Sequence, residues 1–277
     1  MTEWRLIEDG VAAGSWNMAV DEALRRRVIY GTSTPCLRFF CWSPPAVSLG
    51  YHQNTCTAVD LSVCREKGIS VVRRPTGGQA VLHATELTYS VTAPSRHPDL
   101  GGDLLTSYSQ IGQGLAAGCR HLGLNVDIRL GQESYRHPPR SGHPYCFQAL
   151  APFEIEIDGW KLIGSAQRRD SKTLLQHGSI PLRLDRELLV QLFGHMDEGY
   201  QFIDLEEALG YLPSLDVVRS AIRAGFAECF GAMSPLALTA EEQHDAIKLQ
   251  AELFGSAEWT MNPPVTGQAS KIADLIR

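Results

Sequence analysis

The hydrophobic pattern of the chain alternates between helical and extended periods. Apolar residues after Ser15 recur at three- and four-residue steps, which predicts a helix that Ser15 caps and that ends near Gly31. The same spacing predicts a helix over residues 107–122, which Gly123 ends. Short apolar runs bounded by proline and glycine predict strands at residues 37–42, 46–49, 69–72, 79–82, 87–91 and 174–180.

Residues 153–164 have a different pattern, in which apolar and acidic residues alternate around the turn pair Asp158-Gly159, and this predicts a β-hairpin. From residue 185 onward the pattern is helical, and Thr239 with Glu242 forms a capping box for the last helix. Together these elements predict an α/β (α+β) fold. We expect one domain, large enough to hold a catalytic site, over residues 1–255, with a sheet body at about 1–182 and a helical part at 183–255. A short tail is expected at 256–277.

Composition and charge narrow the possible functions. The chain has 277 residues, of which 44% are hydrophobic, and a net charge of -6, values typical of a soluble globular protein rather than a disordered, collagen-like or disulfide-scaffold protein. A pI near 5.8 argues against a nucleic-acid-binding role. The charged start and the lack of about 18 consecutive apolar residues predict a cytoplasmic protein with no membrane span.

The seven cysteines are scattered without CxxC pairs. Their odd number and spacing favour reduced thiols over a disulfide framework or a zinc site, so no metal is expected. As small apolar side chains they are expected to be mostly buried. They are Cys36, Cys41, Cys56, Cys64, Cys119, Cys146 and Cys229.

Two arginines and two glycines lie between predicted strands in the segment from Arg73 to His83, RRPTGGQAVLH. Glycines let the backbone approach a ligand closely and expose its N–H groups, and arginines add positive charge. The segment can therefore hold an acyl carbonyl, a carboxylate or a phosphate, or it is an ordinary hairpin turn. It is not a Walker loop, because no Gly-Lys-Ser/Thr follows.

Cys146 follows a proline-rich stretch, residues 132–145, that lacks an apolar period and is predicted to be a surface loop. A thiol beside His143 suits a nucleophile of lowered pKa, because the thiolate attacks and a nearby cation stabilises it. A packed structural thiol is the alternative. Lys161 precedes the small residues Gly164 and Ser165 on the predicted hairpin, where it can meet a closely approaching substrate or be a solvated lysine on an edge strand.

Taken in chain order, these motifs resemble the biotin/lipoate protein ligase superfamily, and within it the cysteine/lysine octanoyltransferases that transfer octanoate from acyl carrier protein to lipoyl domains. The matching segments span about residues 4–182. They are SWNMAVDE from Ser15, LRF from Leu37 with Trp42, Pro45 to Gly50, the RRPTGGQAVLH segment, ELTYS from Glu86, Cys146-Phe147, KLIGSAQ from Lys161 and LQHGS from Leu175.

The resemblance implies a mixed β-sheet flanked by helices and an acyl tunnel beside the glycine segment. Cys146 would carry the acyl group as a thioester, and Lys161 would orient or polarise the carbonyl. The implied substrate-binding residues are Arg73, Arg74, Thr76, Gly77, Gly78, His83, Gly164 and Ser165. No cofactor is implied. The implied donor is octanoyl-acyl carrier protein, and the implied acceptors are lipoyl domains of the glycine-cleavage H protein or of 2-oxoacid dehydrogenase acyltransferase subunits.

The chain departs from the family pattern at two places near this segment. Gln79 stands where the family usually has Arg or Gly, and Ala84 stands where it has Asp, which removes the acidic residue expected beside His83. The residues after Cys146 also differ from the family's Asp-x-Pro-Ser pattern.

The implied chemistry needs no ATP, because transfer between thioesters is nearly isoenergetic and amide formation is downhill. His83, His143 and His177 are candidates for the base, and a satisfied core histidine is the alternative for each. Three other functions stay open: an ATP-dependent lipoate ligase, an amidotransferase between lipoyl domains, and a non-catalytic acyl carrier. Cys146 favours the transferase, since only covalent catalysis requires a positioned thiol.

Overall fold

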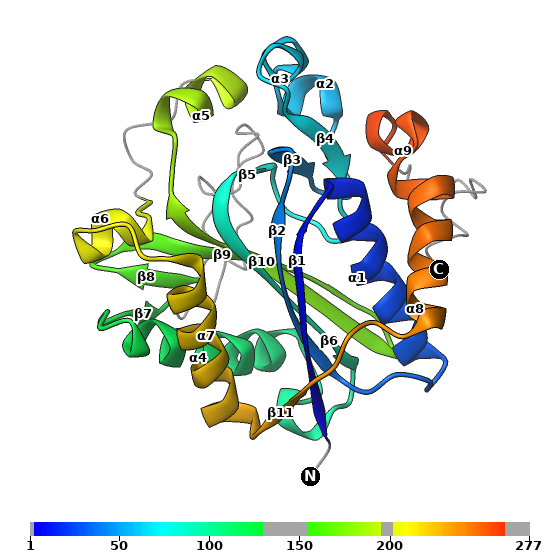
Figure 1. Ribbon diagram of the computed structural model, residues 1–277, viewed down its shortest axis with the longest axis vertical. Helices are drawn as coiled ribbons and strands as arrows, with labels where there is room; N and C mark the ends of the chain where they lie inside the picture. The colour runs from blue at the N-terminus through cyan, green and yellow to red at the C-terminus, as the bar shows by residue number, and fades with distance from the viewer. Residues whose placement is uncertain (1–2, 130–153, 195–201, 264–277) are drawn as a thin grey trace.

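The structure is a computed structural model, which describes residues 3–129, 154–194 and 202–263. Figure 1 shows a large twisted sheet with helices on both faces and a small sheet at one end. The expected loop at residues 132–145, together with His143 and Cys146, lies outside the described residues.

Within the described residues the larger sheet has eight strands. They are β1 (Trp4–Ala12), β2 (Cys36–Trp42), β6 (Thr85–Pro94), β7 (Asp127–Ile128), β8 (Ile155–Ile157), β9 (Trp160–Arg169), β10 (Thr173–Arg183) and β11 (Met233–Pro235). Their spatial order is β11-β1-β2-β6-β10-β9-β8-β7. β1 pairs in parallel with β11 and β2, and the other pairings are antiparallel. The expected mixed sheet is confirmed.

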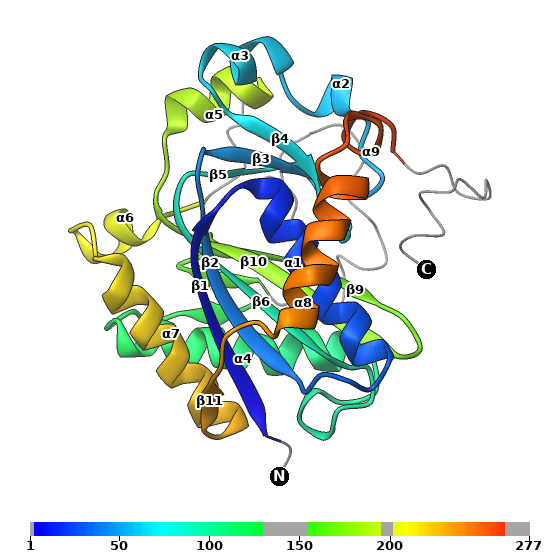
Figure 2. The same cartoon turned by 45° about the vertical axis from the view of Figure 1, so that its right-hand side comes forward.

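Helices cover both faces of this sheet because its strands are apolar on both sides. Successive side chains of β2 alternate, so that Phe39 enters one core and Phe40 the other. The first core packs against α4 (Leu104–His121) and α7 (Leu215–Phe230), and the second packs against α1 (Gly14–Ile29) and α8 (Ala240–Leu249). Figure 2 shows α8 lying along α1, with α4 and α7 on the far side of the strands.

The small sheet lies across one end of the larger one (Figure 2). Its strands are β3 (Ala46–Leu49), β4 (Ser70–Arg73) and β5 (Val81–His83), in the order β4-β3-β5. A third apolar cluster, which includes Val47, Leu82 and Leu189, packs this sheet against short helices. The short elements are α2 (Thr55–Ala58), α3 (Leu61–Glu66), α5 (Arg186–Phe193), α6 (Leu205–Leu209), the 3-10 turn η1 (Pro98–Leu100), the π-helical segment η3 (Gln250–Phe254) and α9 (Ala257–Met261).

The structure confirms most of the predicted elements and corrects two details. The turn at Asp158-Gly159 has the positive φ angles of 50° and 81° that a tight hairpin requires, and the Thr239–Glu242 capping box is present. The expected cap by Ser15 is wrong, because Ala13 is the N-cap of α1 and the Ser15 hydroxyl instead accepts a hydrogen bond from Gln250 at 3.0 Å. Strands β1, β7 and β11 were not predicted.

The expected tail from residue 256 differs from the structure, which continues the packed body through α9. Trp259 is fully buried, and its indole N–H donates to the Arg73 carbonyl at 2.9 Å. The Arg73 guanidinium donates in return to the carbonyls of Trp259 and Thr260, at 3.0 and 2.8 Å. The small sheet therefore holds α9 through a buried arginine, which the hydrophobic pattern does not reveal.

Helices α4 and α7 approach closely because glycines face each other at their crossing. A Cβ atom on Gly225 would overlap the backbone nitrogen of Gly118 and would lie 2.5 Å from the Gly114 carbonyl oxygen. We expect Gly225→Ala to lower the free energy of unfolding by about 1–3 kcal/mol or more, because neither backbone can give way. Urea denaturation measures this, with Gly102→Ala as the control, since nothing lies within 4 Å of its Cβ position. Equal stability of the two variants would contradict the tight crossing.

Candidate functional site

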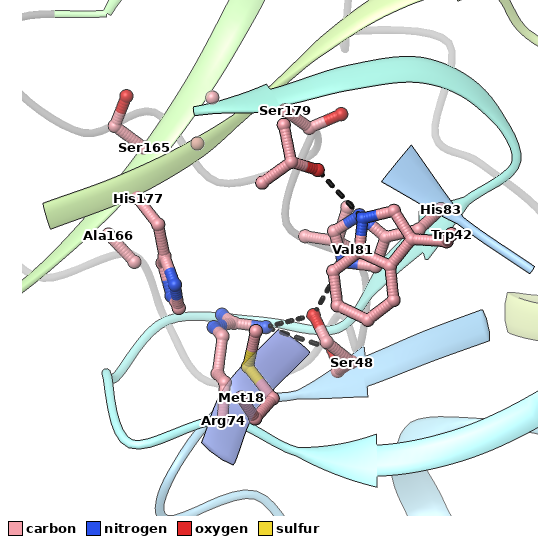
Figure 3. A pocket seen from close by; sticks show the side chains of 13 residues that line it. Met18, Trp42, Ser48, Arg74, Val81, His83, Ser165, Ala166, His177 and Ser179 are labelled. Atoms are coloured by element: carbon pink, nitrogen blue, oxygen red, sulfur yellow. Dashed lines mark hydrogen bonds between the residues drawn. The ribbon is translucent and has the colours of Figure 1, made fainter. Parts of the chain in front are cut away.

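A cavity lies between the small sheet, the larger sheet and α1. It comprises about 350 Å³ of space between protein atoms, a figure that includes the solvent space at its mouth. Figure 3 shows His177 and Ala166 on one side and Trp42 and His83 on the other. The lining residues are Met18, Trp42, Ser48, Arg74, Val81, His83, Thr88, Gly164, Ser165, Ala166, His177, Gly178 and Ser179.

Arg74 shapes the glycine segment beside this cavity. Its guanidinium donates to the carbonyls of Gly77 and Gln79 at 2.7 and 2.6 Å, and to the Ser48 carbonyl and hydroxyl at 2.9 and 3.1 Å. One arginine thus closes the turn on itself and attaches it to β3. The positive charge of the segment lies at the cavity wall, where a developing negative charge on a substrate would be stabilised.

The two glycines of the turn have different roles. Gly78 has a φ of +86°, a left-handed conformation that favours glycine. A Cβ atom on Gly50 would overlap the Gly78 carbonyl oxygen, so the turn packs directly on the backbone after β3. The Gly77 Cβ position is open, with nothing within 4 Å, and leaves room beside the cavity.

His83 belongs to a first buried hydrogen-bond network. Its Nδ1 lies 2.8 Å from Glu86 Oε1, its Nε2 lies 2.8 Å from the Ser48 hydroxyl, and its ring stacks on Trp42 with 3.9 Å between centroids. Burial opposes ionisation of Glu86, yet His83 and the hydroxyls of Ser179 and Thr88 hold the pKa of this carboxyl below its usual value. Although Ala84 stands where the family has Asp, His83 does have an acidic partner in this structure, which is Glu86.

His177 belongs to a second network on the opposite wall. Its Nε2 lies 2.6 Å from the Thr76 hydroxyl and its Nδ1 lies 3.2 Å from Asp21 Oδ2. Burial lowers the pKa of His177 although Asp21 opposes the shift, so the imidazole is neutral near neutral pH. Burial would raise the pKa of Asp21, but His177 and the Arg38 guanidinium hold it below its usual value. This network attaches the glycine segment to β10.

The small residues Gly164 and Ser165 of β9 form part of the cavity wall. The Ser165 hydroxyl lies 2.6 Å from the Tyr89 hydroxyl, whose pKa burial raises to about 12. Gly178 lies opposite Ser165 in the pairing of β9 with β10. A Cβ on Gly178 would lie 2.6 Å from both the Gly164 carbonyl oxygen and the Tyr89 ring, so the two strands can meet only with glycine there.

Arg73 and Lys161, two expected site residues, do not line the cavity. Arg73 donates to backbone carbonyls of the turn after β3 and of α9, and burial beside Arg74 lowers its pKa to about 10. Lys161 is fully buried on β9 and forms an ion pair with Glu154. The structure therefore brings together Arg74, Gly164, Ser165 and His83 at the cavity, with Thr76 behind His177.

The six described cysteines lie away from this cavity. Burial raises the pKa of Cys36 and Cys119 to about 12, and that of Cys41 and Cys64 to about 11. These thiols are protonated at neutral pH and are poor nucleophiles. Among the described residues, no cluster of three or more His, Cys, Asp or Glu side chains is arranged to hold a metal ion. No helix in this part of the chain combines the length and apolar character needed to cross a bilayer.

Sequence reasoning missed Ser48 and Glu86 as partners of His83, and Asp21 as the partner of His177. A signal existed in β6, where Glu86, Thr88 and Ser90 place polar side chains at two-residue spacing inside an apolar strand. Such a stripe shares one face of a sheet, and here Thr88 accepts from the Trp42 indole at 2.7 Å while Ser90 donates to Asp21 at 2.8 Å. Gln79, a departure from the family pattern, accepts a hydrogen bond from Gln53 at 2.6 Å.

Comparison with known proteins identifies the family. The family model for the lipoyl protein ligase A/B catalytic domain matches residues 14–227. The chain belongs to this family. Two curated family members are named octanoyltransferase LipM: one from Symbiobacterium thermophilum is 38% identical over 94% of this chain and 98% of its own length, and one from Moorella thermoacetica is 38% identical over 92% and 97%. Similarity at this level over nearly the whole length shows that the chain is an acyltransferase.

Solved structures of the family share the fold. A lipoate-protein ligase A bound with ATP has a TM-score of 0.79 at 24% identity, covering 94% of this chain and 98% of its own. A structure described as a bi-partite lipoate protein ligase and its E2 lipoyl domain, from Thermoplasma acidophilum, has a TM-score of 0.77 at 24% identity, covering 96% and 99%. The resemblance seen in the sequence motifs is confirmed.

The buried imidazoles predict how stability depends on pH. Burial lowers the pKa of His177 and of His97, so between their folded and unfolded pKa values the unfolded chain binds more protons. Stability is then complete above the unfolded value of about 6.5 and is lost as the pH falls below it. We expect the urea midpoint to fall between about pH 7.5 and about pH 5.5, and to fall less in a His97→Gln/His177→Gln variant. The exposed His244 provides the control, since His244→Gln should keep the full dependence.

Proposed function

We propose that this acyltransferase moves an octanoyl group from octanoyl-acyl carrier protein to a lysine of a lipoyl domain, through a thioester on Cys146, in lipoate biosynthesis. The observation that carries the proposal is the near-full-length similarity to relatives named octanoyltransferase. Lipoyl domains of the glycine-cleavage H protein or of 2-oxoacid dehydrogenase acyltransferase subunits are the proposed acceptors. The structure described as a lipoate protein ligase and its E2 lipoyl domain supports this acceptor class.

The cavity supports an acyl substrate of small cross-section. One wall is made by Gly164, Ala166 and Gly178, which have little or no side chain, and the other by the apolar side chains of Met18 and Trp42. A narrow apolar slot of this kind suits an unbranched chain. Arg74 lines the cavity and is the proposed partner of the polar carbonyl end of the substrate, with the backbone of Gly77, which Arg74 contacts, beside it.

The other cysteines support Cys146 as the nucleophile. Burial raises the pKa of Cys36, Cys41, Cys64, Cys119 and Cys229, and Cys56 is exposed outside the cavity. A covalent acyltransferase needs a thiol that can ionise near its substrate. Cys146 lies outside the described residues and follows the proline-rich segment beside His143, the position that the family motif assigns to the nucleophile.

Replacement of Cys146 tests the thioester directly. Full-length protein incubated with octanoyl-acyl carrier protein should gain one octanoyl group by intact mass, and hydroxylamine should remove it. Cys146→Ser should lose transfer to a lipoyl domain by at least about 10³-fold, because an alcohol is a far weaker nucleophile than a thiolate. Cys56→Ser is the matched control, since Cys56 is exposed and remote from the cavity. Full turnover in Cys146→Ser would refute the covalent route.

The same assay separates the ATP-dependent ligase, which is the second candidate. ATP and magnesium should not change the rate with octanoyl-acyl carrier protein, because a thioester is already activated. A strict need for ATP with free octanoate would instead support the ligase. Retention of octanoate without a covalent adduct would support a carrier.

Lys161 is proposed to stabilise the oxyanion that forms when the thioester carbonyl is attacked. An ammonium held on a hairpin strand acts as a fixed point charge, and the planar guanidinium of arginine cannot occupy the same position. Its ion pair with Glu154 fixes the side chain but also makes replacement costly, because removal of one partner leaves a buried charge.

We therefore expect Lys161→Arg, and the charge-balanced pair Lys161→Ala/Glu154→Gln, to lose about 10²–10³-fold in kcat with little change in KM. Steady-state kinetics with varied octanoyl-acyl carrier protein measures the split, and Lys172→Ala on the exposed turn before β10 is the control. A raised KM with unchanged kcat would assign Lys161 to substrate docking instead.

A further inference from the structure

The hydrogen-bond polarity around Glu86 can be derived from the indole of Trp42. A tryptophan N–H only donates, and Trp42 Nε1 lies 2.7 Å from the Thr88 hydroxyl. Thr88 must therefore direct its own proton to Glu86 Oε1, and Ser179 donates to Oε2. Glu86 accepts hydrogen bonds at both oxygens and its pKa lies below the usual value, so the carboxyl is ionised and His83 donates Nδ1–H across their 2.8 Å contact.

The polarity on the other side of His83 follows from Arg74. A guanidinium also only donates, and Arg74 Nη1 lies 3.1 Å from the Ser48 hydroxyl oxygen. In the tautomer that carries its proton on Nδ1, Nε2 is an acceptor, and it lies 2.8 Å from the same oxygen. The Ser48 hydroxyl therefore donates to His83, and the network has room for one more proton, on Nε2.

From this polarity, and resting on the proposed acyl transfer, we propose that Ser48 and His83 relay the proton that the acceptor lysine loses during amide formation, with Glu86 as the positioning residue. Ser48 lines the cavity and is the cavity end of the relay. The base of this reaction is otherwise unassigned.

The proposed step balances without a further reactant. The lysine amine attacks the octanoyl thioester, so that a C–N bond forms and the C–S bond to Cys146 breaks. The nitrogen gives one proton to Ser48, Ser48 gives its own proton to His83 Nε2, and the leaving thiolate finally takes the proton back. Glu86 stabilises the transient imidazolium, because its carboxylate lies 2.8 Å from Nδ1.

The second histidine of the cavity fits this role less well. The hydroxyl on His177 Nε2 belongs to Thr76, which is fully buried and does not line the cavity, so no described hydroxyl links His177 to a substrate there. The charged or titratable groups that face His83 are Glu86 on β6, Arg74 beside β4 and His177 on β10.

The test isolates the amide-forming half of the reaction. Octanoylated full-length enzyme is prepared from octanoyl-acyl carrier protein, freed of donor and mixed with a lipoyl domain, and the octanoyl-lysine product is followed by mass spectrometry. His83→Gln and Ser48→Ala should slow this half-reaction by about 10²–10⁴-fold, the usual contribution of general base catalysis. His97→Gln, which changes a buried histidine outside the cavity, should keep the wild-type rate.

Two readouts separate proton transfer from a structural defect. Hydroxylamine is already unprotonated at neutral pH, so it should cleave the octanoyl-enzyme of both variants at the wild-type rate. The second readout is the formation of the octanoyl-Cys146 species, which intact mass should show in both variants. Variants that lose the lysine and hydroxylamine reactions equally would overturn the relay.

Failure of the proposed function gives a different result. If the wild-type enzyme forms no octanoyl-Cys146 species, the proposed function is refuted, and the relay is refuted with it. If that species forms in the wild type and in both variants, and lysine transfer proceeds at the wild-type rate in all three, the relay alone is refuted.

Discussion

The buried carboxylate of Asp21 is the interaction on which the rest of the site depends. It lies on α1 and accepts hydrogen bonds from Arg38 on β2 and Ser90 on β6, both at 2.8 Å, and it contacts His177 on β10. A buried charge is tolerated only with such partners, and removal of one typically costs about 3–5 kcal/mol. The helix is therefore fixed against three strands of the larger sheet, and through His177 against the glycine segment as well.

The cavity exists because two sheets meet at a junction that side chains do not fill. Within the two sheets, backbone packs against backbone at Gly50 and at Gly178, where a Cβ atom would collide with neighbouring atoms. Arg74 holds the glycine turn on the small sheet by donating both to that turn and to Ser48 on β3, and the contact between Thr76 and His177 joins the turn to β10. The geometry of the cavity is thus set by arginine, glycine and buried carboxylates rather than by apolar packing alone. This explains why the residues of the family motifs around the cavity are polar although most of them are buried.

The sequence predicted the elements that have a clear period, and it failed where long-range polar contacts decide the structure. Strands such as β3 and helices such as α4 follow from apolar spacing. β1 escaped prediction because its polar Arg5 is buried against Glu242, 237 residues away, at 2.6 Å. The family motifs indicated the Arg74 and His83 neighbourhood, but the partnership with Glu86 depends on strand register, which a single sequence does not specify.

The proposed thioester would need protection from water until the amine arrives, and the polar groups at this cavity already have partners within the protein. Ser48, His83 and His177 bind other protein groups rather than presenting unused donors to solvent. Water that enters such a site finds few partners, which disfavours ordered water there. The same arrangement leaves His83 Nε2 as a place where a proton can be added without rebuilding the network. Exclusion of water and readiness to take a proton therefore follow from one pattern of hydrogen bonds. The Trp42 indole and the Arg74 guanidinium can only donate, so the hydroxyl that each contacts directs its own proton toward the pair of Glu86 and His83.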